Sequence, residues 1–189
     1  AIYHQYEILV GLEKYEEARL LMEESVEICR ATGYQSQLNC SLTALGIVLA
    51  KQGKMDQAME HIEKAIQVAT QIHDLWGQEF SLRTLGTNLR LQKKYPEALK
   101  TFACSLEVAK QMGDRIGAGI ILANMSIVTN VLEDYHASGK YAQEAFVIFQ
   151  TIGSEYQMAF PLRLMAYAAI HAGNLVYARE LNLQSLKQN

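Results

Sequence analysis

Residues 35–74 read QSQLNCSLTALGIVLAKQGKMDQAMEHIEKAIQVATQIHD, and this stretch decides the fold. In its first half, Leu42, Leu45 and Leu49 follow one another at helical spacing, so they lie on one face of a helix. A glycine and a lysine interrupt the pattern, and a second apolar stripe with the same spacing begins at Met55. The stretch therefore predicts two helices joined by a short turn, which is an antiparallel helical hairpin.

The whole chain of 189 residues repeats this pattern with a constant 40-residue period, without an insertion or a deletion. A fixed period of this kind predicts an all-α solenoid of stacked hairpins, here with about ten helices in a single domain over 1–189. The repeats span approximately 1–34, 35–74, 75–114, 115–154 and 155–189. The complete first helices are predicted at 35–51, 75–91, 115–131 and 155–171, and the second helices begin at Tyr15, Met55, Tyr95, Tyr135 and Leu175.

Small residues recur in two slots of the repeat, where we expect paired helices to approach closely. The slot on the first helix holds Gly46, Gly86, Ser126 and Ala166, and the slot on the second helix holds Ala58, Ala98, Ser138 and Ala178. Pro161 falls inside a predicted first helix, so that helix either starts near Phe160 or kinks. Asn182 places a polar residue in a core slot of the last helix, which favours a capping repeat at this end.

Residues typical of helix ends recur at the same positions of each repeat and support the same division into first and second helices. Residues suited to end a second helix stand at equivalent positions, namely Gly33, His73, Gly113 and Gly153. Residues suited to cap the following first helix come next, namely Asp74, Asp114 and Ser154.

Composition limits the function. The net charge of −3 gives no electrostatic basis for direct nucleic-acid binding. The three cysteines form no CxxC pair and suit reduced thiols in the cytoplasm. The N-terminus lacks a signal-peptide pattern, and the apolar run 116–132 stays in register with the repeat, so we expect no membrane span. Because the chain begins without Met inside a partial repeat, we expect it to be part of a larger protein.

The motif Leu-x-x-Leu-Gly, then Gly-Lys-Met-x-x-Ala, then Ile-x-x-Ala, beginning at Leu42 and ending at Ala65, resembles the tetratricopeptide repeat. The resemblance covers essentially the whole chain and is closest to the 40-residue variety in bacterial LuxR-type and STAND-type signalling regulators, kinesin light chains and G-protein-regulating scaffolds. It implies a right-handed superhelix whose first helices line a concave groove that binds peptides, proteins or small inducers.

The first helices are more basic than the rest of the chain. They carry five basic residues and two acidic ones, whereas acidic residues gather on the second helices. The groove residues that we predict are Thr43, Phe80, Arg83, Thr87, Arg90, Asn124, Asn130, Arg163 and Tyr167. Arginine can hold a carboxylate through two hydrogen bonds, and asparagine can pair with an extended peptide backbone. For the arginines and Asn124, solubility is the alternative role, and for the aromatic residues it is packing between repeats.

Arg83 and Asn124 also match in kind two residues of the carboxylate clamp of chaperone-binding tetratricopeptide domains, and we expect them to be neighbours. Thr87 stands where the clamp has a second asparagine, and Phe160 and Leu164 stand where it has basic residues. A partner that is acidic or has a free C-terminal carboxylate is therefore predicted, but a chaperone tail is not.

No motif in the chain predicts catalysis. The histidines are scattered, and there is no HExxH, phosphate-binding loop or GxSxG pattern. We expect no enzyme activity, no cofactor and no metal. The hypotheses are a protein- or peptide-binding regulatory module of a signalling or transcription-regulating protein, a small-molecule inducer sensor, and a self-assembly module whose edge repeats expose apolar faces.

Overall fold

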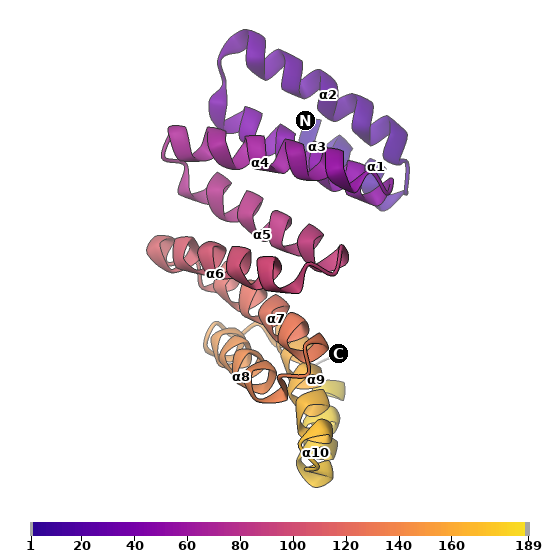
Figure 1. Cartoon of the computed structure of the whole chain (residues 1–189), viewed down its shortest axis with the longest axis vertical. Helices are drawn as coiled ribbons and strands as arrows, with labels where there is room; N and C mark the ends of the chain where they lie inside the picture. The colour runs from indigo at the N-terminus through magenta and orange to yellow at the C-terminus, as the bar shows by residue number, and fades with distance from the viewer. Residues whose placement is uncertain (1, 188–189) are drawn as a thin grey trace. The chain divides into compact units, whose positions relative to one another are not determined.

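The computed structural model describes residues 2–187, which form ten α-helices and no strand (Figure 1). The helices are α1 (Ile2–Gly11), α2 (Tyr15–Thr32), α3 (Gln35–Lys51), α4 (Met55–Gln71), α5 (Leu75–Leu91), α6 (Tyr95–Met112), α7 (Arg115–Val131), α8 (Tyr135–Thr151), α9 (Glu155–His171) and α10 (Leu175–Leu186). Consecutive helices pack against each other from α1 to α5 and from α6 to α10, as in α3 with α4 and α7 with α8. The predicted all-α fold of stacked helical hairpins is confirmed.

The chain forms two compact units, residues 1–94 with α1–α5 and residues 95–189 with α6–α10. The boundary falls between α5 and α6, inside the third repeat of the sequence. Each unit has its own pairs of packed helices, so each is described by itself. A single domain over the whole chain stays a prediction.

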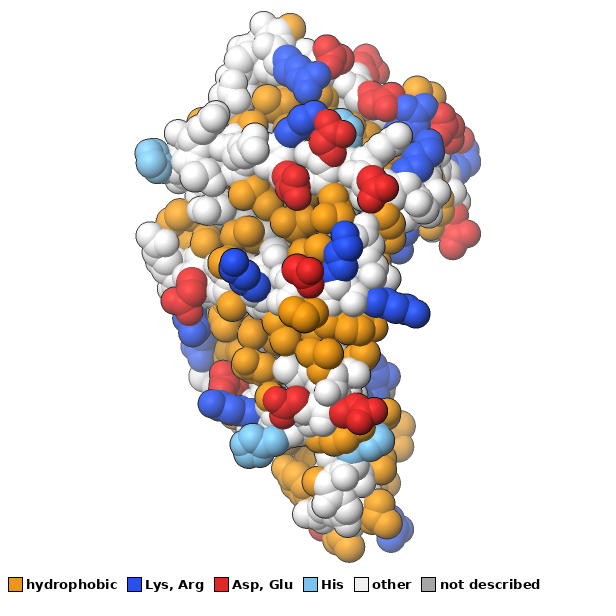
Figure 2. Space-filling view, in the orientation of Figure 1, with side chains coloured by type: hydrophobic (Ala, Val, Ile, Leu, Met, Phe, Trp, Pro, Cys, Tyr) orange, Lys and Arg blue, Asp and Glu red, His pale blue; other side chains and the backbone are white. Residues whose placement is uncertain are grey.

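The helix bounds follow the period of the sequence. The first helices α3, α5, α7 and α9 begin and end at the predicted residues, and each second helix begins at its predicted aromatic or aliphatic residue. The period alone places these bounds because the turns inside the hairpins are identical in length. Acidic side chains lie over the second helices α2 and α4 in the space-filling view (Figure 2).

Each turn between two helices contains one residue with a left-handed backbone conformation. Gly33, Gly113 and Gly153 have φ values of 76°, 71° and 70°, and His73 adopts 56° at the equivalent position, as predicted. The turns inside the hairpins use the same device at residues 13, 53, 93, 133 and 173. In one example, the amide of Asp74 donates to the Ala69 carbonyl at 2.9 Å, which closes the end of α4 across the left-handed residue.

Two of the three predicted N-caps bond as expected. The Asp74 and Asp114 carboxylates accept the amides three residues later at 3.0 and 2.9 Å. Ser154 occupies the cap position of α9, but its hydroxyl is 2.9 Å from Oε1 of Gln157 and makes no cap bond, so that prediction is wrong in detail. Further caps not predicted from the sequence are Asp134 on α8 and Asn174 on α10.

The small-residue slots lie in the helix contacts of the core. All eight positions are buried. A Cβ atom on Gly46 would lie 2.5 Å from Cγ1 of Ile62, which is too close for an unshifted neighbour. Ser126 and Ser138 fill the same two slots in the other unit, where their hydroxyls bond at 3.1 Å. These slots therefore set the approach of α3 to α4 and of α7 to α8.

For Pro161, one of the two alternatives is excluded, because α9 begins at Glu155 and not near Phe160, and Pro161 is buried inside the helix. A kink at Pro161 stays a prediction. The expectation for Asn182 is wrong, because this residue is exposed, while Leu181 and Ser185 supply the buried face of α10. Within residues 2–187, no helix is long and apolar enough to cross a membrane.

Candidate functional site

The first helices of the C-terminal unit expose an apolar and aromatic stripe. Each stripe follows residues three or four positions apart, so its members share one helix face. On α7 the stripe consists of Ile116, Ile120, Asn124, Ile127 and Val131, and on α9 it consists of Tyr156, Phe160, Arg163, Tyr167 and His171. Tyr156 is 84% exposed and Tyr167 is 48% exposed. Large aromatic side chains at such exposure are typical of a binding surface.

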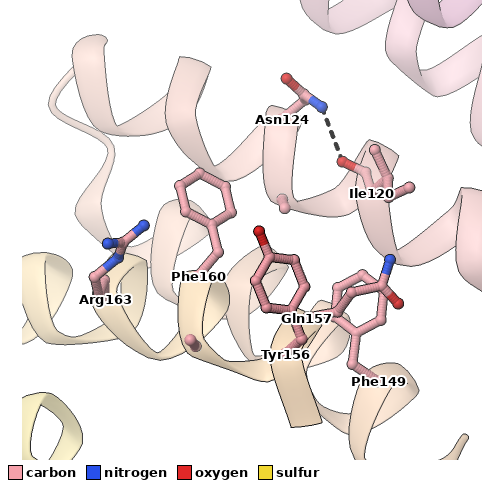
Figure 3. Close-up of a pocket in the computed structure, with 9 residues that line it drawn as sticks. Ile120, Asn124, Phe149, Tyr156, Gln157, Phe160 and Arg163 are labelled. Atoms are coloured by element: carbon pink, nitrogen blue, oxygen red, sulfur yellow. Dashed lines mark hydrogen bonds between the residues drawn. The ribbon is translucent and has the colours of Figure 1, made fainter. Parts of the chain in front are cut away.

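A pocket of about 440 Å³ opens between these two stripes (Figure 3). Three helices build it: α9 supplies one side, α7 supplies the other, and α8 contributes Phe149 at the end of its last turn. The lining residues are Ile120, Ala123, Asn124, Phe149, Tyr156, Gln157, Ala159, Phe160 and Arg163. We refer to this set as the first-helix pocket. It combines an apolar wall with a few polar groups, which is the usual composition of a ligand site.

Small residues on α7 and α9 determine where the large side chains of the pocket lie. Gly119 has no side chain, and a Cβ atom there would lie 2.7 Å from Cζ of the buried Phe149. The Phe149 ring therefore takes the space beside Gly119. Ala123 and Ala159 are also too short to fill the seam between the helices.

The equivalent seam in the N-terminal unit is filled by a buried polar network. Nδ2 of Asn39 on α3 donates to the Ala65 carbonyl at 2.8 Å and to Oγ of Ser81 on α5 at 2.9 Å. The hydroxyls of Thr43 and Ser81 bond at 2.7 Å. Thr43 is fully buried in this network, so its predicted place in a ligand groove is wrong.

Two predicted groove residues, Asn124 and Arg163, line the first-helix pocket. Nδ2 of Asn124 donates to the Ile120 carbonyl one turn earlier at 3.0 Å, which fixes the amide at the pocket edge (Figure 3). The guanidinium carbon of Arg163 lies 5.5 Å from the centre of the Phe160 ring, a cation–π contact.

The other two predicted groove residues of this unit lie outside the pocket lining. Tyr167 is one turn further along α9, where its ring packs 4.6 Å from His171. His171 in turn stacks on Tyr135 at 4.2 Å. Asn130 is half-buried near the end of α7, and its Oδ1 has no hydrogen-bond partner among the described residues.

Four predicted residues of the N-terminal unit lie on α5. The Phe80 ring stacks on Trp76 at 5.5 Å and carries the Arg83 guanidinium at 5.5 Å. Nε of Arg83 donates to Glu79 at 2.8 Å, so Arg83 is already engaged by an internal carboxylate. The Thr87 hydroxyl donates to the Arg83 carbonyl at 2.9 Å, within the same helix.

The remaining residue on α5, Arg90, is half-buried, and its Nε has no hydrogen-bond partner among the described residues. Because Arg83 and Asn124 belong to different units, their proximity stays a prediction.

Sequence reasoning missed five lining residues, namely Ile120, Phe149, Tyr156, Gln157 and Ala159. Tyr156 could have been found, because it stands two repeats after Trp76 in the same slot and one turn before Phe160. Phe149 gives no signal of its own. Its ring reaches the pocket because Gly119 leaves room for it. This contact joins two residues that are far apart in the sequence, so neither residue alone predicts it.

A second hollow of about 540 Å³ lies between α6 and α8 over α7. Aliphatic side chains such as Leu122 and Val147 line it, and its charged residues are of both signs. It contains none of the predicted groove residues. Among the described residues, no three His, Cys, Asp or Glu side chains gather to hold a metal ion.

A stack of helical hairpins with one constant period defines a repeat scaffold. This chain belongs to the tetratricopeptide repeat family, whose sequence model matches residues 7–71 and 37–111. The sequence-based resemblance is thereby confirmed. Among curated protein sequences, none matches the chain.

Solved structures share the fold at low sequence identity. BtubC (BKLC) from P. vanneervenii is 14% identical with a TM-score of 0.87, and the alignment covers 99% of this chain and 78% of that one. A signal transduction ATPase with numerous domains and a tetratricopeptide repeat sensor, from Pyrococcus horikoshii, is 17% identical with a TM-score of 0.86, over 98% of this chain and 28% of that one.

A Rap protein complexed with competence and sporulation factor is 15% identical with a TM-score of 0.79, over 99% of this chain and 53% of that one. The chain thus spans about a quarter to a half of the last two proteins. At these identities the likeness concerns the fold alone.

Proposed function

We propose that the protein is a non-catalytic scaffold that binds a peptide or protein segment on its first helices, with the first-helix pocket as the anchor point. The observation that carries the proposal is the exposed aromatic pair Tyr156 and Phe160 beside a preformed pocket. Preformed pockets beside aromatic side chains concentrate binding energy in protein interfaces. The complex of a Rap protein with competence and sporulation factor supports a ligand-binding role for this architecture.

The proposed setting is a regulatory or interaction module of a larger cytoplasmic signalling or transcription-regulating protein. The structural likeness to a multidomain ATPase with a tetratricopeptide repeat sensor supports such a setting. The partner that the sequence predicts, acidic or with a free C-terminal carboxylate, fits the arginine at the edge of the pocket.

A peptide-display selection on the immobilised chain tests this function. Peptides that are enriched on the wild type are expected to bind the double variant Tyr156→Ala/Phe160→Ala at least about tenfold more weakly, since buried aromatic anchors contribute about 2 kcal/mol or more. Both side chains are exposed, so the variant should keep its fold.

The matched control is Leu175→Ala/Tyr177→Ala, which removes an exposed aliphatic and an exposed aromatic side chain from the second helix α10. Equal binding of the enriched peptides to the wild type and to the pocket variant contradicts the assignment of this surface.

A small-molecule sensor is the second candidate, and one observation favours it. The pocket volume of about 440 Å³ falls in the range of small-molecule sites. A metabolite screen by thermal shift would detect it, because a ligand at a hundred times its Kd stabilises the folded state by about 2.7 kcal/mol. In this case Tyr156→Ala/Phe160→Ala should lose the shift, and a screen without stabilising compounds argues against a sensor.

A further inference from the structure

The chain carries the same triplet of side chains twice, two repeats apart. Trp76, Phe80 and Arg83 occupy three slots on α5, and Tyr156, Phe160 and Arg163 occupy the same slots on α9. In both helices the guanidinium carbon lies 5.5 Å from the phenylalanine ring centre. The two guanidinium groups therefore lie over equivalent rings on their own helices.

What differs is the residue one turn before each arginine. On α5 it is Glu79, whose side chain is 3% exposed and accepts Nε of Arg83 at 2.8 Å. On α9 the same slot holds Ala159, a wall residue of the first-helix pocket. Among the described residues Arg163 forms no ion pair, and its side chain is exposed at the edge of the pocket.

We infer that the first-helix pocket takes a carboxylate from the ligand and pairs it with Arg163, in the position that Glu79 fills for Arg83. The ligand class is a peptide segment in which a carboxylate stands beside an apolar side chain. This inference rests on the proposed function, because it names the chemistry that the same site recognises.

The pocket lining determines the apolar half of the ligand. Phe149, Phe160 and Ile120 present aromatic and aliphatic surface within the same hollow as Arg163 (Figure 3). A ligand side chain placed there loses contact with water and shields the neighbouring Arg163 from solvent, so the guanidinium becomes a better partner for an anion than one in open solvent. Arginine also offers two parallel donors for a planar carboxylate.

The experiment compares three capped peptides that present the carboxylate differently. The first is N-acetyl-Ala-Ala-Phe with a free C-terminal carboxylate, the second is its C-terminal amide, and the third is N-acetyl-Ala-Glu-Phe-Ala amide. Each is titrated into the isotope-labelled chain, and amide and arginine side-chain resonances are followed by NMR. The free acid or the glutamate peptide is expected to bind about tenfold more tightly than the plain amide, and the stronger of the two identifies the source of the carboxylate.

Three variants connect the effect to the proposed pair. Arg163→Gln should reduce binding of the carboxylate peptide to the level of the plain amide and leave the amide unchanged. Ala159→Glu should have the same effect while Arg163 is still present, because it supplies the internal carboxylate found on α5. Arg179→Gln on α10 is the matched control, since this exposed arginine lies on a second helix of the same unit and outside the pocket lining, and carboxylate binding should stay within about twofold of the wild type.

The outcomes separate the inference from the function on which it rests. If carboxylate peptides and the amide bind α7 and α9 equally, or if Arg163→Gln binds like the wild type, the inferred carboxylate site is wrong. The proposed binding of peptides at the first-helix pocket is then unaffected. If none of the peptides shifts any resonance of α7 or α9, both the proposed peptide binding at the first-helix pocket and the inferred carboxylate site are wrong.

Discussion

Asn39 holds the seam between α3 and α5, and its replacement tests whether this polar network stabilises the N-terminal unit. Its side chain is fully buried and makes two short hydrogen bonds, to the Ala65 carbonyl at 2.8 Å and to Ser81 at 2.9 Å. Asn39→Ala removes both bonds and leaves a small void. The acceptors are not stranded, because Ala65 lies within α4 and Ser81 also bonds the Gly77 carbonyl at 2.8 Å.

The expected loss follows from these contacts. Two hydrogen bonds contribute about 1 kcal/mol each, and the void left by the amide adds about 1 kcal/mol, so unfolding should become easier by about 2–3 kcal/mol. A loss of this size lowers the Tm of a unit of this length by roughly 10–20 °C.

Urea unfolding followed by tryptophan fluorescence measures the effect at a site in this unit. The chain has a single tryptophan, Trp76, and it lies on α5 next to the seam. Ser36→Ala, an exposed change on the same helix as Asn39, is the control and should stay within about 0.5 kcal/mol of the wild type. A double-mutant cycle with Ser81→Ala should give a coupling of about 1 kcal/mol. If Asn39→Ala costs less than about 0.5 kcal/mol, or if the coupling is zero, this role of the network is refuted.

Three further changes test other parts of the structure. Gly119→Ala should destabilise the C-terminal unit by about 1–3 kcal/mol in thermal unfolding, because the new methyl group meets the Phe149 ring, and Phe149→Leu should relieve part of the loss. Asp114→Ala should cost about 1 kcal/mol through the lost N-cap bond, whereas Ser154→Ala should change stability by less than about 0.5 kcal/mol. Burial raises the pKa of Tyr6 to about 12, so its contribution to stability is complete below pH 10 and is lost as the pH rises through about 12, and Tyr6→Phe should flatten alkaline unfolding in this range.

The helices could be predicted from the sequence because one rule governs all of them. Each hairpin reuses the same apolar spacing, and each turn contains one left-handed residue. The helix bounds of one hairpin, shifted by one period, therefore give the bounds of the next. Left-handed Lys93 and Glu133 show why glycine alone is an incomplete signal. At these turns the position in the repeat decides the conformation, although the residue type disfavours it.

The site could be predicted only in part, because the exposure of a side chain at a given repeat position depends on the residues that pack against it. Thr43, Arg83 and Arg163 share one slot of the first helix, yet the first is buried against Ser81, the second pairs with Glu79, and the third is exposed at a pocket. Periodicity places all three on the same face. It does not say which face is covered, since that is determined by the size and polarity of the residues across the seam.

The seam between first helices is where the repeats of this protein differ in chemistry. Its key slot holds Asn39, Glu79, Gly119 and Ala159 in successive first helices. Asparagine there links α3 to α5, and glutamate pairs with an arginine on its own helix, so both side chains are engaged by groups of the chain itself. The glycine is covered by the Phe149 ring, and the alanine lines the first-helix pocket beside Arg163, which pairs with no carboxylate among the described residues. Core slots cannot vary in this way without loss of packing, so ligand specificity in such a solenoid is expected to reside in this seam slot.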